Sequence, residues 1–226
     1  IDICYNTSIL YNKGKYVVYG GYWNGEIIIK YLDYKLKNKN TYILSTPECS
    51  PITKIVIENS ETYALCANKL GTLFLFTISS EKKYDWKLSS MFYEQKSEIA
   101  SLAISENLSM FITCSSEGYC MLYSFPLCKL FNSWKIEIDN EKILCTIILI
   151  FHAPLPCFIF YIKNLRYLCV YSINGKFLKK NKIDYEICEK GIQQYIDYQC
   201  REYLLIYNSK NKTIDLNRGI NFDLLA

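Results

Sequence analysis

Short apolar runs separated by polar turns recur along the chain, whereas the 3.6-residue periodicity of an amphipathic helix is hard to find. The runs are dominated by Ile, Tyr, Phe, Val and Thr, which favour the pleated surface of a sheet. The pattern predicts strands over residues 17–21, 27–29, 52–57, 63–67, 73–76, 99–104, 110–115, 120–123, 145–150, 157–162, 167–173, 192–196, 203–207 and 213–216. The sequence therefore predicts an all-β fold.

The predicted strands recur in register with a period of 46 or 47 residues. The turn glycine Gly25 is followed by Gly71 after 46 residues, and Gly71 is followed by Gly118 after 47. A period of this length with several strands per unit is typical of a β-propeller, in which each blade is a small sheet that cannot bury both faces alone. An irregular β-sandwich is the alternative, and it would not need this register.

Residues 1–226 are predicted to form a single β-propeller region of about five degenerate blades. The blade-like units cover roughly residues 1–33, 41–79, 88–125, 136–178 and 183–217. The chain does not begin with Met, and five equal blades seldom stop at arbitrary cuts. We therefore expect a piece, truncated at both ends, of a larger, seven-bladed ring.

Nine residues at the predicted hairpin turns are expected to be structural, since glycine supplies the positive φ that such turns need. They are Gly20, Gly21, Trp23, Asn24, Gly25, Gly71, Gly118, Asn174 and Gly175. A phosphate-binding loop is the alternative for the first glycines, but the chain lacks the Gly-Lys-Ser/Thr and Gly-x-Gly-x-x-Gly patterns. Tyr22 and Trp23 are candidates for contact with a partner, because aromatic residues lead interface hot spots. Packing of Trp23 between blades is the favoured alternative.

Composition and charge exclude several classes of function. The chain has 26 Lys+Arg against 22 Asp+Glu, and a net charge of +4 is too small for a nucleic-acid footprint. His152 is the single histidine, so a multi-histidine metal site is excluded, and we expect it to cap the tip of a hairpin. The carboxylates Glu58, Glu61, Glu106 and Glu117 fall on turns, which indicates turn chemistry. No catalytic, cofactor-binding or metal-binding residue is assigned, and no enzyme is expected.

Eleven cysteines are present, none in a C-x-x-C pair, and most lie inside apolar runs where a thiol behaves as a small hydrophobe. Buried free thiols in a reducing compartment are therefore expected, with a disulfide framework or a zinc site as the alternatives.

Residues 143–162 carry no formal charge over a length that could span a membrane. His152, Pro154 and Pro156 interrupt this stretch and indicate a turn. Two strands joined by a turn are therefore predicted there, with a membrane helix as the alternative.

Two lysine-rich clusters, residues 33–39 and 176–182, lie between the predicted blades. We interpret them as solvated connecting loops. Contact with anionic lipid head groups is the alternative.

Three segments resemble the propeller that follows the BEACH domain in neurobeachin-like proteins. Residues 20–27 (GGYWNGEI) resemble its Gly-Gly-aromatic/His-Trp-Asp pattern, residues 113–120 (TCSSEGYC) its Ser-Gly-Ser-x-Asp-Gly turn of WD repeats, and residues 168–176 (LCVYSINGK) its Tyr-Ser-Val-Asn-Gly-Lys segment. Their order and separation agree with the family. No Gly-His or Trp-Asp dipeptide is present, so the usual hydrogen-bond tetrad of a WD blade cannot form in this chain.

The resemblance implies a WD-repeat-like β-propeller at the C-terminal part of a scaffold for vesicle and membrane traffic. It implies a cytoplasmic location, possible peripheral membrane association, and partners that are other proteins, including the BEACH domain of the same longer chain. No nucleic acid is expected. A basic surface that touches anionic lipid or RNA is one alternative. A propeller enzyme is another, but it would need acidic residues on the innermost strands, and residues 52–57 and 99–104 carry none.

Overall fold

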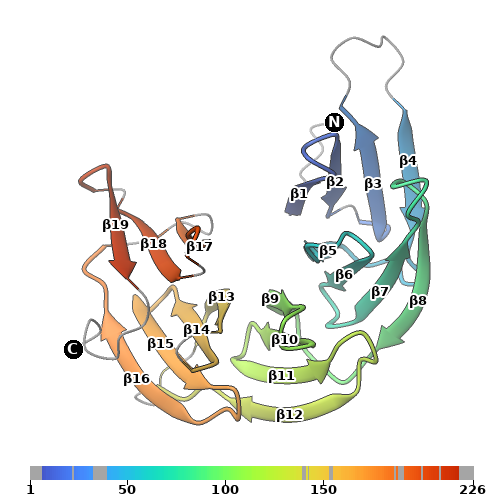
Figure 1. The fold of residues 1–226 in the computed structure, drawn as a ribbon. Helices are drawn as coiled ribbons and strands as arrows, with labels where there is room; N and C mark the ends of the chain where they lie inside the picture. The colour runs from blue at the N-terminus through green and yellow to red at the C-terminus, as the bar shows by residue number, and fades with distance from the viewer. Residues whose placement is uncertain are drawn as a thin grey trace. The chain divides into compact units, whose positions relative to one another are not determined.

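The structure, a computed structural model, describes residues 7–21, 23–32, 40–138, 141, 143–152, 155–185, 187, 191–199, 201–208 and 210–218. In these residues the chain forms nineteen strands and no helix. The strands make five antiparallel sheets, four with four strands and one with three, each built from strands consecutive in sequence (Figure 1). Such a succession of small meander sheets is the architecture of propeller blades. The predicted fold class, an all-β β-propeller with five blades visible, is confirmed.

The chain divides after Glu106 into two compact units, which are described separately. The first unit contains sheet 1, with β1 (Thr7–Tyr11), β2 (Tyr16–Gly20), β3 (Glu26–Tyr31) and β4 (Thr41–Ser45). It also contains sheet 2, with β5 (Ile52–Ile57), β6 (Tyr63–Asn68), β7 (Leu73–Ile78) and β8 (Trp86–Phe92), followed by β9 (Ile99–Ser105).

Sheets 1 and 2 share an apolar core. Its buried residues are Tyr11, Val18, Ile27, Ile29, Ile52, Ile55, Ala64, Cys66, Phe74, Phe76, Ile78 and Trp86. The two sheets approach so closely at the end of β2 that a Cβ on Gly20 would lie 2.7 Å from Cγ2 of Ile52. Gly20 is therefore required by packing between sheets, and no positive φ is involved at this residue.

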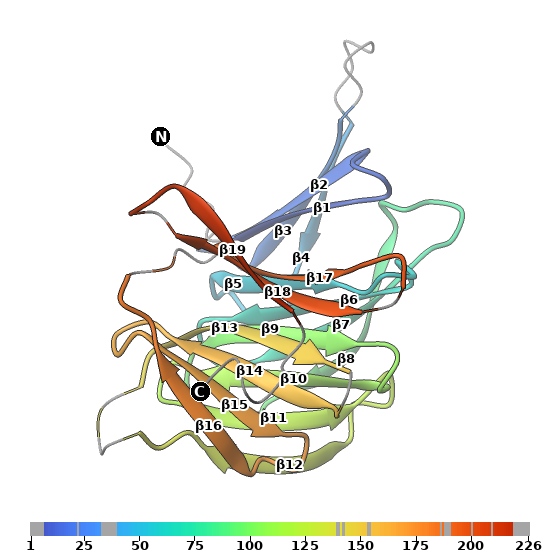
Figure 2. The same cartoon turned by 60° about the vertical axis from the view of Figure 1, so that its left-hand side comes forward.

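The second unit contains three further strands of sheet 3, β10 (Met110–Ser115), β11 (Tyr119–Ser124) and β12 (Leu130–Lys135), in the sheet order β12-β11-β10-β9. Sheet 4 follows with β13 (Cys145–Phe151), β14 (Cys157–Ile162), β15 (Tyr167–Ser172) and β16 (Phe177–Lys182), whose strands lie side by side in Figure 2. Sheet 5 has β17 (Ile192–Ile196), β18 (Glu202–Asn208) and β19 (Thr213–Arg218).

Sheets 4 and 5 share the second apolar core. Its buried residues are Ile147, Phe151, Cys157, Ile159, Tyr161, Leu168, Val170, Ile183, Ile187, Ile192, Leu204 and Ile206. Residues 143–162 contribute β13 and β14 to this unit, paired antiparallel from Cys145↔Ile162 to Phe151↔Cys157. The prediction of two strands joined by a turn is confirmed, and the membrane-helix alternative is wrong.

The extents of the sheets differ from the predicted unit boundaries. Sheet 1 runs to Ser45, because residues 41–45, placed with the second unit from the sequence, pair with β3 as its outer strand. Likewise β8, which ends at Phe92, pairs with β7 and belongs to sheet 2. These outer strands lack a continuous apolar run because much of their surface faces solvent, so the sequence pattern that identifies buried strands misses them.

Candidate functional site

Trp23 lies in the turn between β2 and β3, in a segment that the sequence singled out. Gly21 (φ +127°) and Gly25 (φ +71°) adopt backbone conformations that favour glycine. The carbonyl oxygen of Gly25 accepts hydrogen bonds from the amide (3.2 Å) and the hydroxyl (2.9 Å) of Thr46, just after β4. A Cβ on Gly25 would collide with the Thr46 hydroxyl. The turn is thereby fixed to the end of sheet 1.

The indole of Trp23 projects into solvent, and the residue is 86% exposed. Packing of Trp23 between blades, the alternative favoured from the sequence, is therefore wrong. The neighbouring candidate Tyr22 lies outside the described residues. The corresponding turn of sheet 2 presents Leu70, which is 63% exposed. Two neighbouring blades of the first unit thus carry a large apolar side chain on the same turn.

The equivalent turns of sheets 2 and 3 share a hydrogen-bonded cap that the sequence analysis missed. A side-chain oxygen at the end of the second strand accepts hydrogen bonds from amides two and four residues further on. Asn68 Oδ1 accepts from Leu70 (3.0 Å) and Thr72 (2.9 Å), and Ser115 Oγ accepts from Glu117 (3.2 Å) and Tyr119 (3.1 Å). Such caps are typical of Asn and Ser in turns, and their recurrence 47 residues apart could have revealed them.

The remaining predicted turn residues lie in these and related turns. Gly71, Gly118 and Gly175 have φ values of +91°, +84° and +75°. Asn24 Oδ1 accepts a hydrogen bond from the amide of Glu26 (3.4 Å), and the carbonyl oxygen of Asn174 accepts one from Asn132 Nδ2 (3.0 Å). The predicted residues therefore sit on four separate turns and do not form one cluster.

Gly175 is fixed by a close approach as well as by its φ. A Cβ at this position would lie 2.7 Å from the indole ring of Trp134 in β12. That indole stacks on Phe158 and Tyr171, with ring centroids 6.0 and 6.4 Å apart. Gly175 therefore allows the turn between β15 and β16 to cover the tryptophan that joins sheets 3 and 4.

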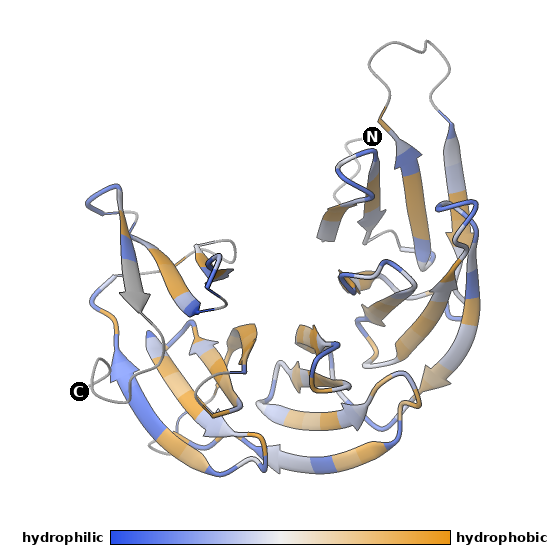
Figure 3. Cartoon of the chain, in the orientation of Figure 1, coloured by the Kyte–Doolittle hydropathy of each residue, from blue (hydrophilic) through white to orange (hydrophobic). Residues whose placement is uncertain are grey.

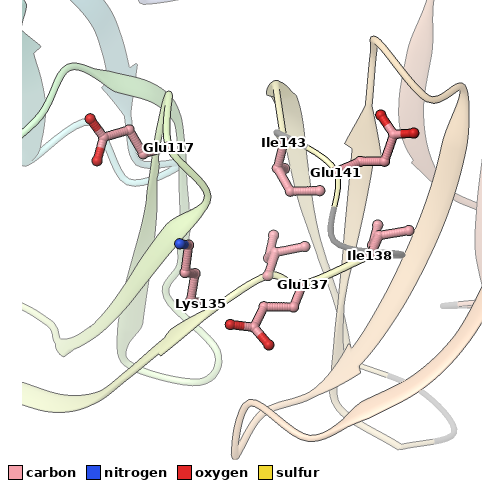
Figure 4. A pocket seen from close by; sticks show the side chains of 7 residues that line it. Glu117, Lys135, Glu137, Ile138, Glu141 and Ile143 are labelled. Carbon is pink, nitrogen blue, oxygen red and sulfur yellow. The ribbon is translucent and has the colours of Figure 1, made fainter.

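A cavity of about 500 Å³ adjoins the turn between β10 and β11. It is lined by Glu117, Lys135, Ile136, Glu137, Ile138, Glu141 and Ile143. In Figure 4 the carboxylates of Glu117 and Glu141 lie on opposite sides of the cavity and point away from each other. The carboxylates of Glu117 and Glu141 therefore do not converge as a catalytic acid and base have to.

Carboxylates on two other turns accept hydrogen bonds from backbone amides. Glu58, buried between β5 and β6, accepts hydrogen bonds at Oε1 from the Ser60 hydroxyl (2.6 Å) and the amides of Thr62 (3.0 Å) and Tyr63 (2.9 Å). Glu106 Oε1 accepts from the amide of Ser60 (3.0 Å). These contacts support the interpretation of Glu58 and Glu106 as structural.

His152 follows β13 at the hairpin to β14, where the sequence placed it. Its amide donates to Glu202 Oε2 (2.7 Å), and its Nδ1 lies 2.5 Å from Glu202 Oε1. Nearby Cys157 is buried, and burial together with the charge of Glu202 raises the pKa of its thiol to about 11. A thiol with a raised pKa carries little of the thiolate that a nucleophile needs. The contacts of His152 with Glu202 therefore join the hairpin of β13 and β14 to β18 in sheet 5.

Eight cysteines fall within the described residues, all as free thiols, and all but Cys49 are buried. Burial raises the pKa of the Cys66 thiol, and Cys114 and Cys120 face each other across β10 and β11. Among the residues that the structure describes, no three His, Cys, Asp or Glu side chains are grouped to hold a metal ion. The buried-thiol interpretation agrees with this arrangement.

One basic cluster has a different structure from the predicted loop. Residues 177–182 form β16, which pairs with β15 along its length. The sequence of β16 is too rich in lysine and asparagine to indicate a strand. Its pairing with the apolar strand β15 outweighs the low strand propensity of these residues. The other cluster, residues 33–39, lies outside the described residues.

No family model matches the chain, and no curated protein is significantly similar to it. The described residues contain no helix that is long and apolar enough to cross a bilayer. A β-propeller is a fold that is compatible with a protein-interaction scaffold, and the fold by itself names no function.

Proposed function

We propose that this chain is a non-catalytic protein-interaction module that binds its partner through the turns that join the second and third strands of its blades. The observation that carries the proposal is the exposure of Trp23 on a turn fixed by hydrogen bonds to Thr46. Tryptophan buries more apolar surface than other side chains and leads interface hot spots. Because the turn is already ordered, little further conformational entropy is lost when a partner covers the indole.

Leu70 supports the same proposal from the adjacent blade. It stands on a turn whose cap, Asn68, holds the amides of Leu70 and Thr72. Solvent exposure of single apolar residues is common, but two on equivalent, rigid turns provide repeated contact points for one partner.

We further propose that the module is the C-terminal propeller of a BEACH-type scaffold, cytoplasmic and peripheral to membranes. The support is the ordered resemblance of residues 20–27, 113–120 and 168–176 to that family. The flanking sequence of the gene tests this assignment. A BEACH domain encoded upstream would support it, whereas a different upstream domain would contradict it.

The interaction proposal is tested by affinity capture with the full-length protein. We expect Trp23→Ala to reduce recovery of the specific partner at least about tenfold, as truncation of a hot-spot aromatic does. The matched control is Leu127→Ala, which removes an apolar side chain of similar exposure, 85%, from the turn between β11 and β12. Equal recovery with wild type and Trp23→Ala would contradict the proposed contact, and specific turnover of a substrate would contradict the non-catalytic role.

A further inference from the structure

The outer strand β16 differs in charge from the other outer strands. It carries three lysines in its six residues, Lys179, Lys180 and Lys182. Among the outer strands of the other four-stranded sheets, β4 carries no lysine, β8 carries one, Lys87, and β12 carries one, Lys135. Most of β16 has hydrophilic colours in Figure 3, in contrast to the neighbouring β14 and β15. Sheet 4 therefore ends in a basic strip.

The backbone of β16 is regular over the lysines. Its partner is β15, with Lys179↔Val170, Lys180↔Cys169 and Lys182↔Tyr167 in register after an irregularity near Leu178. Within the part of the chain that the structure describes, no strand pairs with the other edge of β16. An edge of this kind offers a row of amide and carbonyl groups to an added strand.

The side chains on this edge have a defined spacing. Residues alternate between the two faces of a strand, so Lys180 and Lys182 share a face, and both are exposed. The ammonium group of Lys180 lies 5.1 Å from the ring centroid of Tyr167, which positions its stem along the sheet. At the start of the strand, Phe177 and Leu178 add exposed apolar surface.

We propose that the outer edge of β16 binds an acidic, extended segment of a partner protein, which joins sheet 4 as a fifth strand. The proposal names the partner's chemistry and rests on the proposed function as an interaction module. Carboxylates at alternate positions of the segment lie opposite Lys180 and Lys182, at the spacing of cross-strand pairs. Apolar residues at its end cover Phe177 and Leu178.

Lysines on an edge strand also serve to prevent aggregation. Protection against aggregation and the proposed binding are compatible. The lysines repel a basic strand by like charge, and a neutral strand would have to desolvate them without compensation. An acidic strand is attracted by the same charges. What separates them is whether an acidic strand binds through its backbone.

The first test uses the fluorescein-labelled peptide Thr-Glu-Val-Glu-Thr-Glu-Val, with binding to the intact chain measured by fluorescence anisotropy. Its control is the same peptide with all its backbone amides N-methylated, which keeps every charge and removes the donors on both edges of the peptide. We expect the methylated peptide to bind at least about tenfold more weakly, because two or more backbone hydrogen bonds are lost. Equal binding of the two peptides, or no binding of either, would overturn the proposal.

The second test places the binding on β16. The double variant Lys180→Gln/Lys182→Gln is expected to weaken binding of the unmodified peptide about fivefold to tenfold. The matched control, Lys87→Gln/Lys135→Gln, removes the same charge from two other outer strands and should change binding less than about twofold. Equal losses in both double variants would overturn the location.

Anionic lipid and RNA are separated in the same assay. Vesicles of phosphatidylcholine and phosphatidylserine, or polyuridylate, that bind through Lys180 and Lys182 while the peptide does not would overturn the proposal and assign the edge to that ligand. If the peptide fails but partner capture still depends on Trp23, the edge proposal alone is wrong and the proposed function stands.

Discussion

Two strands of the same sheet, β14 and β16, differ in burial and in strand pairing. All six residues of β14 are buried, whereas every residue of β16 is exposed or half-buried. β14 pairs with strands on both sides, and β16 pairs only with β15 among the described strands. The middle of the sheet therefore holds most of the apolar burial that stabilises the fold, and its outer edge is left for contact with solvent or a partner.

The first prediction tests this contrast with one substitution type in both strands. Phe160→Ala, in β14, removes a fully buried ring that contacts Tyr171 edge-on at 5.3 Å. We expect it to lower the free energy of unfolding by about 3–5 kcal/mol, measured by urea denaturation. Phe177→Ala, in β16, removes a ring that is 45% exposed and should cost about 1 kcal/mol or less. Similar losses of unfolding free energy in the two variants would contradict the difference in burial between β14 and β16.

The second prediction concerns Gly175, in the turn that joins the largely buried strand β15 to the exposed outer strand β16. Gly175→Ala brings a methyl group against the indole of Trp134 and must hold a positive φ, so we expect a loss of about 2–3 kcal/mol in the free energy of unfolding. Gly14→Ala is the matched control, because Gly14 has φ +77° and no atom within 4 Å of the added methyl. Its cost should be about 1 kcal/mol, from the backbone alone. Equal costs would show that the contact with Trp134 is not tight.

Sheet 5 differs from sheet 4 in the way that one of its turns is stabilised. The turn between β17 and β18 is held by hydrogen bonds to a charged carboxylate, Asp197. Asp197 accepts hydrogen bonds from the amides of Gln199 (2.8 Å) and Arg201 (2.9 Å) and from Arg201 Nε (2.7 Å). Burial opposes the charge on Asp197, but these hydrogen bonds outweigh it and lower its pKa to about 2. Since the pKa in the unfolded chain is about 3.9, the stabilisation is complete above about pH 4 and is lost as the pH falls to about 2.

The third and smallest predicted effect follows from that pH range. Asp197→Asn should lower the midpoint of thermal unfolding at neutral pH, and the gap to wild type should narrow as the pH falls from about 4 to about 2. The exposed residue Asp184 supplies the control, as Asp184→Asn should leave the midpoint almost unchanged at every pH. A gap for Asp197→Asn that stays constant down to pH 2 would contradict the role of its charge.

The sequence predicted the strands whose burial is continuous. The runs at 63–67 and 157–162 are apolar throughout, and they appear as β6 and β14. The glycines Gly25, Gly71 and Gly118 marked the turns because few other residues tolerate their backbone conformation. These features are local, so the sequence displays them directly.

The outer strands and the exposure of Trp23 could not be predicted in the same way. β12 and β16 are strands because their neighbours supply the hydrogen-bonding edge, and their own residues are half polar. A tryptophan has the same apolar character whether it packs between sheets or projects from a turn. The structure shows that Trp23 is exposed, on a turn that Thr46 holds through its hydrogen bond to Gly25. The candidate contact surface therefore depended on tertiary structure.

Hydrogen–deuterium exchange across sheet 4 is the most direct test of the division between buried middle strands and open outer edges. We expect the amides of β14 to exchange only when the unit unfolds, and those of β16 to exchange on average at least about tenfold faster. Protection of β16 equal to that of β14 in the isolated chain would contradict the account.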